Sequence, residues 1–258
     1  MTVSKEFLFA LAAAAAEQET LPRFRQNGLI ENKLAAGFDP VTEADQAAEL
    51  AIRRLIEKEF PEHGILGEEH GSVRLDSQHV WVIDPIDGTR AFISGIPVWG
   101  TLIGLKDDGI AVAGLMAQPF TGEIFYALQG ESFLQRRDQS QRLKCRKTEN
   151  LDEATLLTTT PSLFKGAVRG RFDQLESKVR LSRYGCDCYA YAMLAAGFVD
   201  LVVETGLNPY DIVALIPIIE SAGGVVKTWD GGWPEGGGNI VAAASQALCE
   251  QAMAVMRG

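Results

Sequence analysis

The spacing of apolar residues in the first part of the chain predicts two helices. The first runs from Ser4, a residue type that favours the N-cap, to about Gln26, and it contains a continuous apolar run at 7–16. The second starts with Thr42 at its N-cap, and its apolar residues recur every three or four positions. Pro61 ends this helix, because proline cannot continue one. The first helix is therefore expected to be buried.

Runs rich in β-branched and apolar residues then predict a sheet. They cover 79–83, 98–105, 110–118 and 123–128. The second and third runs form a predicted hairpin, because the turn sequence Lys106-Asp107-Asp108-Gly109 joins them. We expect an antiparallel sheet with helices on one side in this half of the chain.

The second half alternates between strands and helices. The predicted strands are 155–159, 180–184, 200–204 and 224–228, and the predicted helices are 166–177, 189–196 and 211–222. Such alternation is typical of βαβ units and predicts a mixed or parallel sheet. The segment 135–150 is polar and rich in charge. We therefore predict an N-terminal α+β domain at 1–140 and a C-terminal α/β domain at 141–258.

Composition narrows the classes of function. The 258 residues include 24 Lys or Arg and 34 Asp or Glu, which gives a formal net charge of −10. This balance argues against broad nucleic-acid binding, although a phosphorylated substrate stays open because bound cations can reverse the local charge. The apolar run at 7–16 has no basic segment before it and is too short to span a bilayer. We expect a cytoplasmic protein that does not bind membranes.

Cysteine and histidine spacing gives no metal or redox motif. None of the four cysteines is part of a Cys-x-x-Cys pair, so we expect free thiols. The histidines His63, His70 and His79 lack ligand spacing and are expected at the surface. Trp99 and Tyr191 are expected in the core.

Acidic residues gather next to predicted turns, at Asp45, Glu68, Asp84, Asp87 and Asp211. Asp84 ends a buried strand, and the turn after it places Asp87 so that both carboxylates can reach one point. Two unpaired carboxylates at one point repel each other, and a hard cation removes the conflict. An all-oxygen set, which the exposed carbonyl of Ile86 would extend, selects Mg²⁺, Mn²⁺ or Ca²⁺ over zinc.

Each acidic pattern also has a purely structural interpretation. Asp87-Gly88-Thr89 is ordinary turn chemistry, and Thr42-x-x-Asp45 fits a capping pair. Glu68-Glu69 fits a solvated loop, and Asp211 fits a helix N-cap. These alternatives stay open for each pattern taken alone.

Taken together, the patterns resemble those of the inositol monophosphatase family. The resemblance rests on Gly67-Glu68-Glu69, on Trp81-Val82-Ile83-Asp84-Pro85-Ile86-Asp87-Gly88-Thr89, and on Asp211 with Ala222-Gly223-Gly224. Their order and spacing match over nearly the whole chain, and Asp-Pro-Ile-Asp-Gly-Thr is highly specific to this superfamily of magnesium-dependent, lithium-sensitive phosphatases. The resemblance implies an αβαβα sandwich of the inositol monophosphatase and fructose bisphosphatase type.

Other segments are similar to one branch of the family, the histidinol-phosphate phosphatases of histidine biosynthesis. They are the segment 38–45, the segment 64–69, the segment 88–95 and Arg183-Tyr184-Gly185-Cys186-Asp187-Cys188-Tyr189. Two positions depart from the wider family pattern: Tyr210 replaces the usual Trp before Asp211, and Ala91 replaces an Asn. Both departures count against a plain inositol monophosphatase, and neither is an expected metal ligand.

The resemblance also implies roles for individual residues. Glu68, Asp84, the Ile86 carbonyl, Asp87 and Asp211 would hold roughly two or three Mg²⁺ ions per site. Glu68 would hold the cation that carries the attacking water. The Thr89 hydroxyl, backed by Asp45, would orient that water or accept its proton. The amides of Gly88 and Thr89, near the start of a helix, would donate to phosphate oxygens.

The alcohol side of the site would come from the second half, through Gly185, Asp187, Glu204 and Asp211, with Arg183 near the phosphate or these acids. Carboxylates at Asp187 and Glu204 would favour a cationic alcohol such as histidinol. Asp187 also fits the N-cap of the helix that follows it.

The resemblance therefore implies hydrolysis of L-histidinol phosphate by a metal-activated water. The first alternative is an inositol monophosphatase or a broad sugar-phosphate phosphatase, and the second is a non-catalytic regulatory binding protein of the same fold. Family members are usually dimers, so a homodimer is expected, with the apolar hairpin at 98–118 as a candidate interface.

Overall fold

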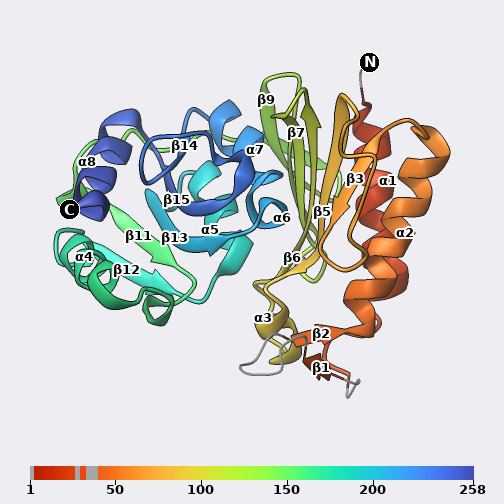
Figure 1. Ribbon diagram of the computed structural model, residues 1–258, viewed down its shortest axis with the longest axis horizontal. Helices are drawn as coiled ribbons and strands as arrows, with labels where there is room; N and C mark the ends of the chain where they lie inside the picture. Colours follow the sequence, from red (N-terminus) through yellow and green to blue (C-terminus); the bar gives the residue numbers. More distant parts are fainter. Residues whose placement is uncertain (1–2, 27–29, 33–39) are drawn as a thin grey trace.

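A computed structural model describes residues 3–26, 30–32 and 40–258 of the chain. Five layers of alternating helix and sheet follow one another across the molecule (Figure 1). This is the αβαβα sandwich that the family resemblance implies. Among the described residues, no helix is both long and apolar enough to cross a bilayer. The four cysteines are free thiols, as their spacing predicts.

The first layer holds two helices, α1 (Lys5–Ala15) and α2 (Glu43–Glu59). Ser4 and Thr42 are their N-caps, as predicted, and each accepts a hydrogen bond from a backbone amide in the first turn. The predicted first helix is shorter than expected, since a π-helical turn, η1 (Ala16–Thr20), follows α1 and residues 21–26 form turns. A short ribbon of β1 (Ile30–Asn32) and β2 (Pro40–Thr42) precedes α2. Asp39 and the rest of 33–39 lie outside the described residues.

The second layer is an eight-stranded sheet. In spatial order its strands are β10 (Gln139–Arg142), β9 (Glu131–Arg136), β8 (Glu123–Leu128), β7 (Ile110–Gln118), β6 (Gly100–Asp107), β5 (His79–Asp87), β3 (Gly64–Gly67) and β4 (Ser72–Val73). The pairs are antiparallel as predicted, except that β3 runs parallel to β5. The sequence patterns miss β9 and β10. Strand β10 is polar and exposed, and β9 has two adjacent apolar residues, Phe133 and Leu134, instead of the apolar alternation of a half-buried strand.

The third layer lies between the two sheets and consists of α5 (Asp187–Ala195), α6 (Pro209–Ile212) and α7 (Leu215–Ser221) (Figure 1). A single helix at 211–222 is therefore a wrong prediction. The chain leaves regular helix between Ile212 and Leu215, close to the first sheet.

The fourth layer is a mixed five-stranded sheet in the order β12 (Leu181–Tyr184), β11 (Thr155–Thr158), β13 (Leu201–Leu207), β15 (Gly238–Ala243) and β14 (Val225–Thr228). Strand β11 is parallel to both β12 and β13, as βαβ units require, whereas β15 is antiparallel to its neighbours. The outer layer holds α4 (Gly166–Glu176) and α8 (Gln246–Arg257). Strand β15 and helix α8 were not predicted.

The remaining elements are short: α3 (Thr89–Ile93), η2 (Leu151–Glu153), η3 (Pro161–Leu163) and η4 (Pro234–Gly236). The chain passes from the first sheet to the second between Arg142 and Thr155. The division into two domains at 140 and 141 stays a prediction.

Three apolar clusters fill the spaces between these layers. One joins α1 and α2 to the first sheet, one joins the two sheets through α5 and α7, and one joins the second sheet to α4 and α8. The fully buried residues at their centres include Trp81, Leu102, Ile216 and Phe172. The middle cluster is continuous from one sheet to the other, so its close packing fixes the position of the two sheets relative to each other.

Two histidine positions differ from expectation. His63 is buried, and it stacks between Phe60 and His79 while its Nδ1 accepts a hydrogen bond of 3.0 Å from Trp81 Nε1. His79 is half-buried in the same stack. His63 and His79 were expected at the surface because they lack metal-ligand spacing. That spacing does not show whether a histidine packs in the core as an aromatic ring.

Candidate active site

The end of strand β5 carries the first two acidic residues of the site. The pairing of β5 with β6 is irregular between Asp84, opposite Leu102, and Asp87, opposite Gly100. Such a bulge bends the strand and redirects its side chains. The Ile86 amide donates to Asp84 Oδ1 at 3.0 Å, which holds this buried carboxylate in place. Gly88 then adopts a φ of +87°, a conformation that favours glycine.

Asp211 reaches the same point from the third layer. It lies in the first turn of α6, where its Oδ2 accepts a hydrogen bond of 2.7 Å from the amide of Asn208, the N-cap. The predicted N-cap role of Asp211 is therefore wrong. Gly104 and Gly114 face each other on β6 and β7, and a Cβ at Gly114 would lie 1.9 Å from the Ala214 carbonyl oxygen. Only glycine allows this close approach, which brings α6 against the first sheet.

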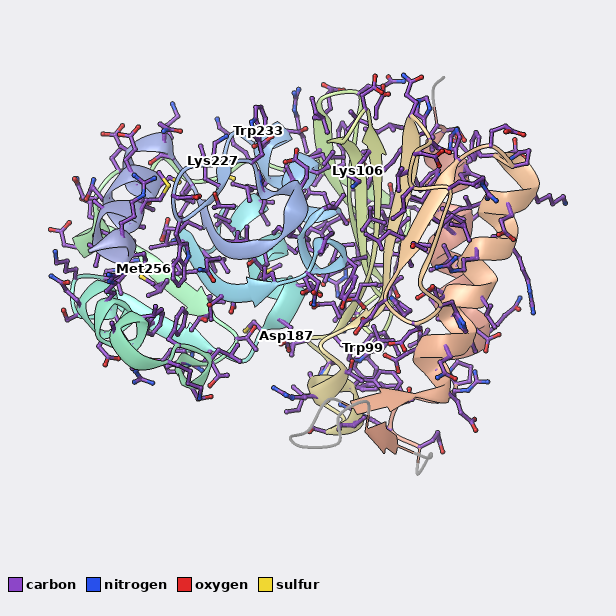
Figure 2. The ribbon with its side chains drawn as sticks, viewed as in Figure 1. Trp99, Lys106, Asp187, Lys227, Trp233 and Met256 are labelled. Carbon is purple, nitrogen blue, oxygen red and sulfur yellow. The ribbon has the colours of Figure 1, made fainter. Side chains whose placement is uncertain are left out.

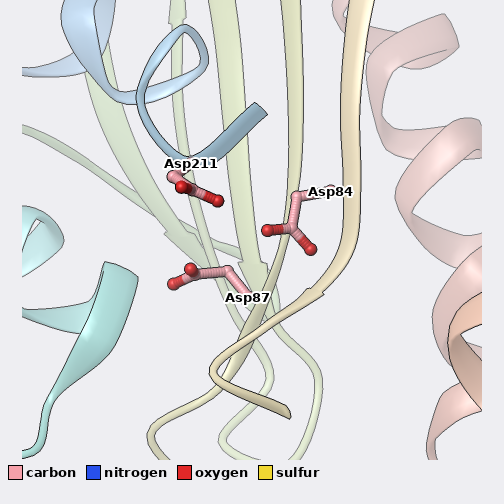
Figure 3. Close-up of side chains that lie close together, drawn as sticks. All are labelled: Asp84, Asp87 and Asp211. Atoms are coloured by element: carbon pink, nitrogen blue, oxygen red, sulfur yellow. The ribbon is translucent and has the colours of Figure 1, made fainter. Parts of the chain in front are cut away.

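Asp84 and Asp87 converge as their spacing predicts, and Asp211 joins them as the family resemblance implies (Figure 3). Each offers a carboxylate oxygen, and these oxygens lie within 4.8 Å of one another. Burial raises the pKa of Asp84 well above its ordinary value, and the charges of Glu68, Asp87 and Asp211 raise it further. Burial followed by the charges of Asp187 and Asp211 has the same effect at Asp87.

This arrangement fits a hard divalent cation. Three carboxylates so close together repel one another when ionised, and a bound cation converts the repulsion into attraction. The donors are all oxygen, the type that Mg²⁺ and Mn²⁺ prefer. The Ile86 carbonyl accepts a hydrogen bond of 3.1 Å from the Thr89 hydroxyl, and a carbonyl oxygen has a second lone pair. Its predicted role as a ligand stays a prediction.

Glu68 lies beside the cluster of three aspartates. Strands β3 and β5 are parallel, so the chain leaves both at the same edge of the sheet, and the Glu68 amide donates to the Ile83 carbonyl at 3.2 Å. The half-buried Glu68 carboxylate raises the pKa of both Asp84 and Asp45. Glu68 and Glu69 do lie in a loop, as the alternative interpretation holds, but both are half-buried rather than fully solvated.

Asp45 and Thr89 do not form the expected pair in this structure. Asp45 Oδ2 accepts hydrogen bonds from the Thr42 amide at 2.9 Å and from the Thr42 hydroxyl at 2.5 Å, so the capping interpretation is confirmed. The Thr89 hydroxyl donates to Ile86 instead. Asp45 Oδ1 is buried and has no hydrogen-bond partner among the described residues, and burial raises the pKa of Asp45 to about 6. A carboxylate oxygen thus stays available beside Glu68.

Asp187 meets the turn after β5 from the opposite half of the molecule (Figure 2). A Cβ at Gly88 would lie 3.1 Å from Asp187 Oδ2, so the carboxylate sits directly against this glycine. Asp187 is the first residue of α5 and caps nothing with its side chain, since Cys186 is the N-cap. The N-cap interpretation of Asp187 is therefore wrong. Its φ of +43° lies in the left-handed region, which is uncommon for a residue other than glycine.

The other predicted substrate residues are placed differently. Glu204 is buried on β13, where it accepts hydrogen bonds from the Thr159 amide at 2.5 Å and the Thr158 hydroxyl at 3.2 Å. Burial raises its pKa to about 7. Gly185 and Arg183 are exposed on the segment that leads into α5. The substrate contacts of these three residues stay predictions.

The sequence patterns missed three residues around the site. Glu49 is fully buried on α2 and binds the loop that carries Glu68, and its spacing of four residues from Asp45 is the signal that could have revealed it. The Cys188 amide donates to Asp87 Oδ2. The Tyr191 hydroxyl is buried without a hydrogen-bond partner among the described residues. Burial raises its pKa, and the charges of Glu204, Asp87 and Asp211 raise it further. No sequence signal separates these last two from ordinary core residues.

The comparisons with known proteins agree on one family. The model of the inositol monophosphatase family matches residues 3–257. The chain is 44% identical, over 75% of its length and 56% of the relative's, to the bifunctional phosphatase IMPL2, chloroplastic, of Arabidopsis thaliana. It is 33% identical to the histidinol-phosphatase of Mycobacterium tuberculosis, over 92% of both chains. A solved inositol monophosphatase from Zymomonas mobilis has a TM-score of 0.85 and 39% identity, with 98% of each chain covered.

Proposed function

The chain belongs to the inositol monophosphatase family of metal-dependent phosphatases, and from this premise we propose that it hydrolyses L-histidinol phosphate to L-histidinol and phosphate with Mg²⁺ as its cofactor. The observation that carries the reaction is the cluster of Asp84, Asp87 and Asp211. The observation that carries the substrate is the carboxylate of Asp187 beside Gly88.

Asp84, Asp87 and Asp211 would hold Mg²⁺, and Glu68 with the Ile86 carbonyl would extend the set of ligands. Bound Mg²⁺ supplies neutralisation of the ester oxygens and a water with a lowered pKa. The chain's own residues supply the rest. Among the described residues, one oxygen of Asp45 has no hydrogen-bond partner, and its raised pKa suits a group that exchanges a proton near neutral pH.

Thr89 lies next to Gly88 at the start of α3, and its hydroxyl donates to the Ile86 carbonyl. A hydroxyl has two lone pairs in addition to this proton. It can therefore accept a hydrogen bond from a reacting water without leaving Ile86. In this way Thr89 would orient the water toward phosphorus and Asp45 would take its proton.

Asp187 supports a cationic leaving alcohol. Its carboxylate lies against Gly88, in the turn after β5 whose amides would bind the phosphate. Asp187 itself belongs to α5, in the half of the molecule that would bind the alcohol. Histidinol carries an ammonium group, which would pair with this carboxylate, whereas inositol carries only hydroxyls. Burial raises the pKa of Asp187, while the Thr159 side chain and Arg90 lower it, and a bound ammonium would favour the ionised form further.

Inositol monophosphate is the second candidate substrate. It is favoured by the structural likeness to the Zymomonas mobilis inositol monophosphatase over nearly the whole of both chains. Both candidate substrates would bind the same metal cluster through their phosphate. They differ in the alcohol, so Asp187 is the residue expected to distinguish between them.

Release of phosphate from histidinol phosphate by the purified protein tests the proposed function. We expect turnover with Mg²⁺, loss of turnover with a chelator, and recovery when Mg²⁺ is restored. Turnover that is unchanged by the chelator, or no turnover of any phosphorylated alcohol with Mg²⁺ or Mn²⁺, would contradict it.

A further inference from the structure

Helix α2 carries a row of buried charged residues along one side. Asp45, Glu49 and Arg53 follow one another at intervals of four, which places them on the same face of the helix. Their exposed fractions are 1%, 0% and 7%. Buried charges are costly unless they are paired, so such a row calls for specific partners.

Glu49 finds its partners in the loop that follows β3. Its carboxylate accepts hydrogen bonds from the Glu69 amide at 2.7 Å and from the His70 amide at 3.2 Å. It also accepts one from Arg53 Nε at 2.6 Å. The other arm of the same guanidinium donates to the Gly71 carbonyl. Glu49 and Arg53 together therefore bind the loop from both ends of the turn after Glu68.

Gly67 shows how closely the carboxylate fits against the start of this loop. A Cβ at this position would lie 2.0 Å from Glu49 Oε1 and 2.4 Å from Glu49 Cδ. The Gly67 amide donates to the Gly71 carbonyl at 3.0 Å, which closes the loop on itself. Glycine is therefore needed where the buried carboxylate packs against the backbone.

The hydrogen bonds of Glu49 and Arg53 to this loop hold Glu68 in place. The Glu68 carboxylate raises the pKa of Asp84 and of Asp45, so it is held among like charges. A loop without support would relieve the repulsion by moving away. The hydrogen bonds from the two amides after Glu68 to Glu49 oppose that movement, and Arg53 balances the charge of Glu49.

We propose that Glu49 is a positioning residue that presets the Glu68 loop for a divalent cation, and that Arg53 is its counter-ion. The inference rests on the proposed function, because it takes Glu68 as a metal ligand. It assigns to α2 two tasks one helical turn apart: Asp45 faces the reacting groups, and Glu49 fixes the ligand loop.

Binding of Mn²⁺ alone to the full-length protein tests this inference, followed by the electron paramagnetic resonance signal of the free ion. We expect Glu49→Gln to raise the Mn²⁺ concentration for half-saturation about 10-fold or more, in line with other groups that orient metal ligands. Glu57→Gln is the matched control, since it makes the same change at an exposed position of the same helix. It should bind Mn²⁺ like the wild type.

Steady-state kinetics separate positioning from a purely structural role. In Glu49→Gln, kcat at saturating Mn²⁺ should return to within about threefold of the wild-type value, because the ligand itself is intact. Unchanged Mn²⁺ half-saturation in a variant with a lowered melting temperature would overturn the inference. Arg53→Lys keeps the charge but loses the donor to Gly71, and it should weaken Mn²⁺ binding by a smaller factor.

Arg53→Lys decides the matter if Glu49→Gln does not fold, since Mn²⁺ binding equal to the wild type in that variant would also overturn the inference. Wild-type protein that binds no Mn²⁺ would contradict the proposed function itself and this inference with it. Normal Mn²⁺ binding by the wild type and all variants would contradict only the role of Glu49.

Discussion

Asp87 Oδ2 accepts a hydrogen bond of 2.5 Å from the backbone amide of Cys188. Asp87 ends a strand of the first sheet, and Cys188 lies in the first turn of α5 between the two sheets. The positive end of the helix dipole favours a carboxylate at this place. This bond joins the two halves of the molecule at the acidic cluster, so the site is complete only when both halves are docked.

Asp87→Asn should abolish most activity and leave the fold intact. The amide oxygen of asparagine can still accept the hydrogen bond from Cys188, but the charge that attracts a cation is gone. We expect kcat/KM to fall at least about 100-fold, while the melting temperature stays within about 3 °C. Asp152→Asn, the same change at an exposed position, should retain full activity. Activity of Asp87→Asn near the wild-type level would show that the cluster is not the metal site.

Removal of the Thr89 hydroxyl should slow the chemical step. We expect Thr89→Val to lower kcat about 100-fold with little change in KM, because the hydroxyl would orient the reacting water rather than bind the ester. Thr89→Ser keeps the hydroxyl and should recover most of the rate. A Thr89→Val variant that raises KM at unchanged kcat would instead place Thr89 in substrate binding.

Asp187→Asn should change substrate preference. A neutral amide beside Gly88 no longer attracts an ammonium group, so kcat/KM for histidinol phosphate should fall about tenfold. The same variant should hydrolyse a neutral ester such as inositol 1-phosphate within about twofold of the wild-type rate, which serves as the internal control. Equal losses on both esters would assign Asp187 to the shared phosphate site.

Much of the acidic site could be predicted from the sequence, because its residues lie next to sequence patterns that predict a strand end or a turn. Asp84 and Asp87 end a buried β-rich run, and a turn with a required glycine follows them. Asp211 could be placed with them only through the family resemblance. What brings it there is the pair Gly104 and Gly114, which lets α6 approach the sheet. Contacts between distant segments of this kind leave no periodic pattern in the sequence.

Other features could not be predicted, for physical reasons that differ from case to case. Strand β10 is polar because it forms the solvent-exposed edge of the sheet, and its partner β9 has only the short apolar pair Phe133-Leu134, so the two resemble a linker. Glu49 looks like any acid on a helix until the loop that it binds is in place. The direction of the Thr89 hydroxyl depends on a single torsion angle, which residue types do not determine.

His63 should make the stability of the protein depend on pH. Burial lowers its pKa, and the charge of His79 lowers it further. The unfolded chain therefore takes up a proton near its ordinary pKa of about 6.5, where the folded chain does not. More protons on the unfolded state mean that the free energy of unfolding falls as the pH drops below about 6.5.

The measurement is the melting temperature at pH 7.5 and 5.5 for the wild type and for His63→Gln. Glutamine can still accept a hydrogen bond from Trp81 but does not titrate. The wild type should lose more stability than the variant over this range. Parallel losses in the two proteins would show that His63 stays unprotonated in both states or protonates equally in both.

The ratio of kcat/KM for histidinol phosphate to that for inositol 1-phosphate tests the account most directly, measured on one preparation at the same saturating Mg²⁺ concentration. The carboxylate of Asp187 against Gly88 predicts a ratio of about 10 or more in favour of histidinol phosphate. A ratio near one, or a preference for inositol 1-phosphate, would contradict the proposed substrate.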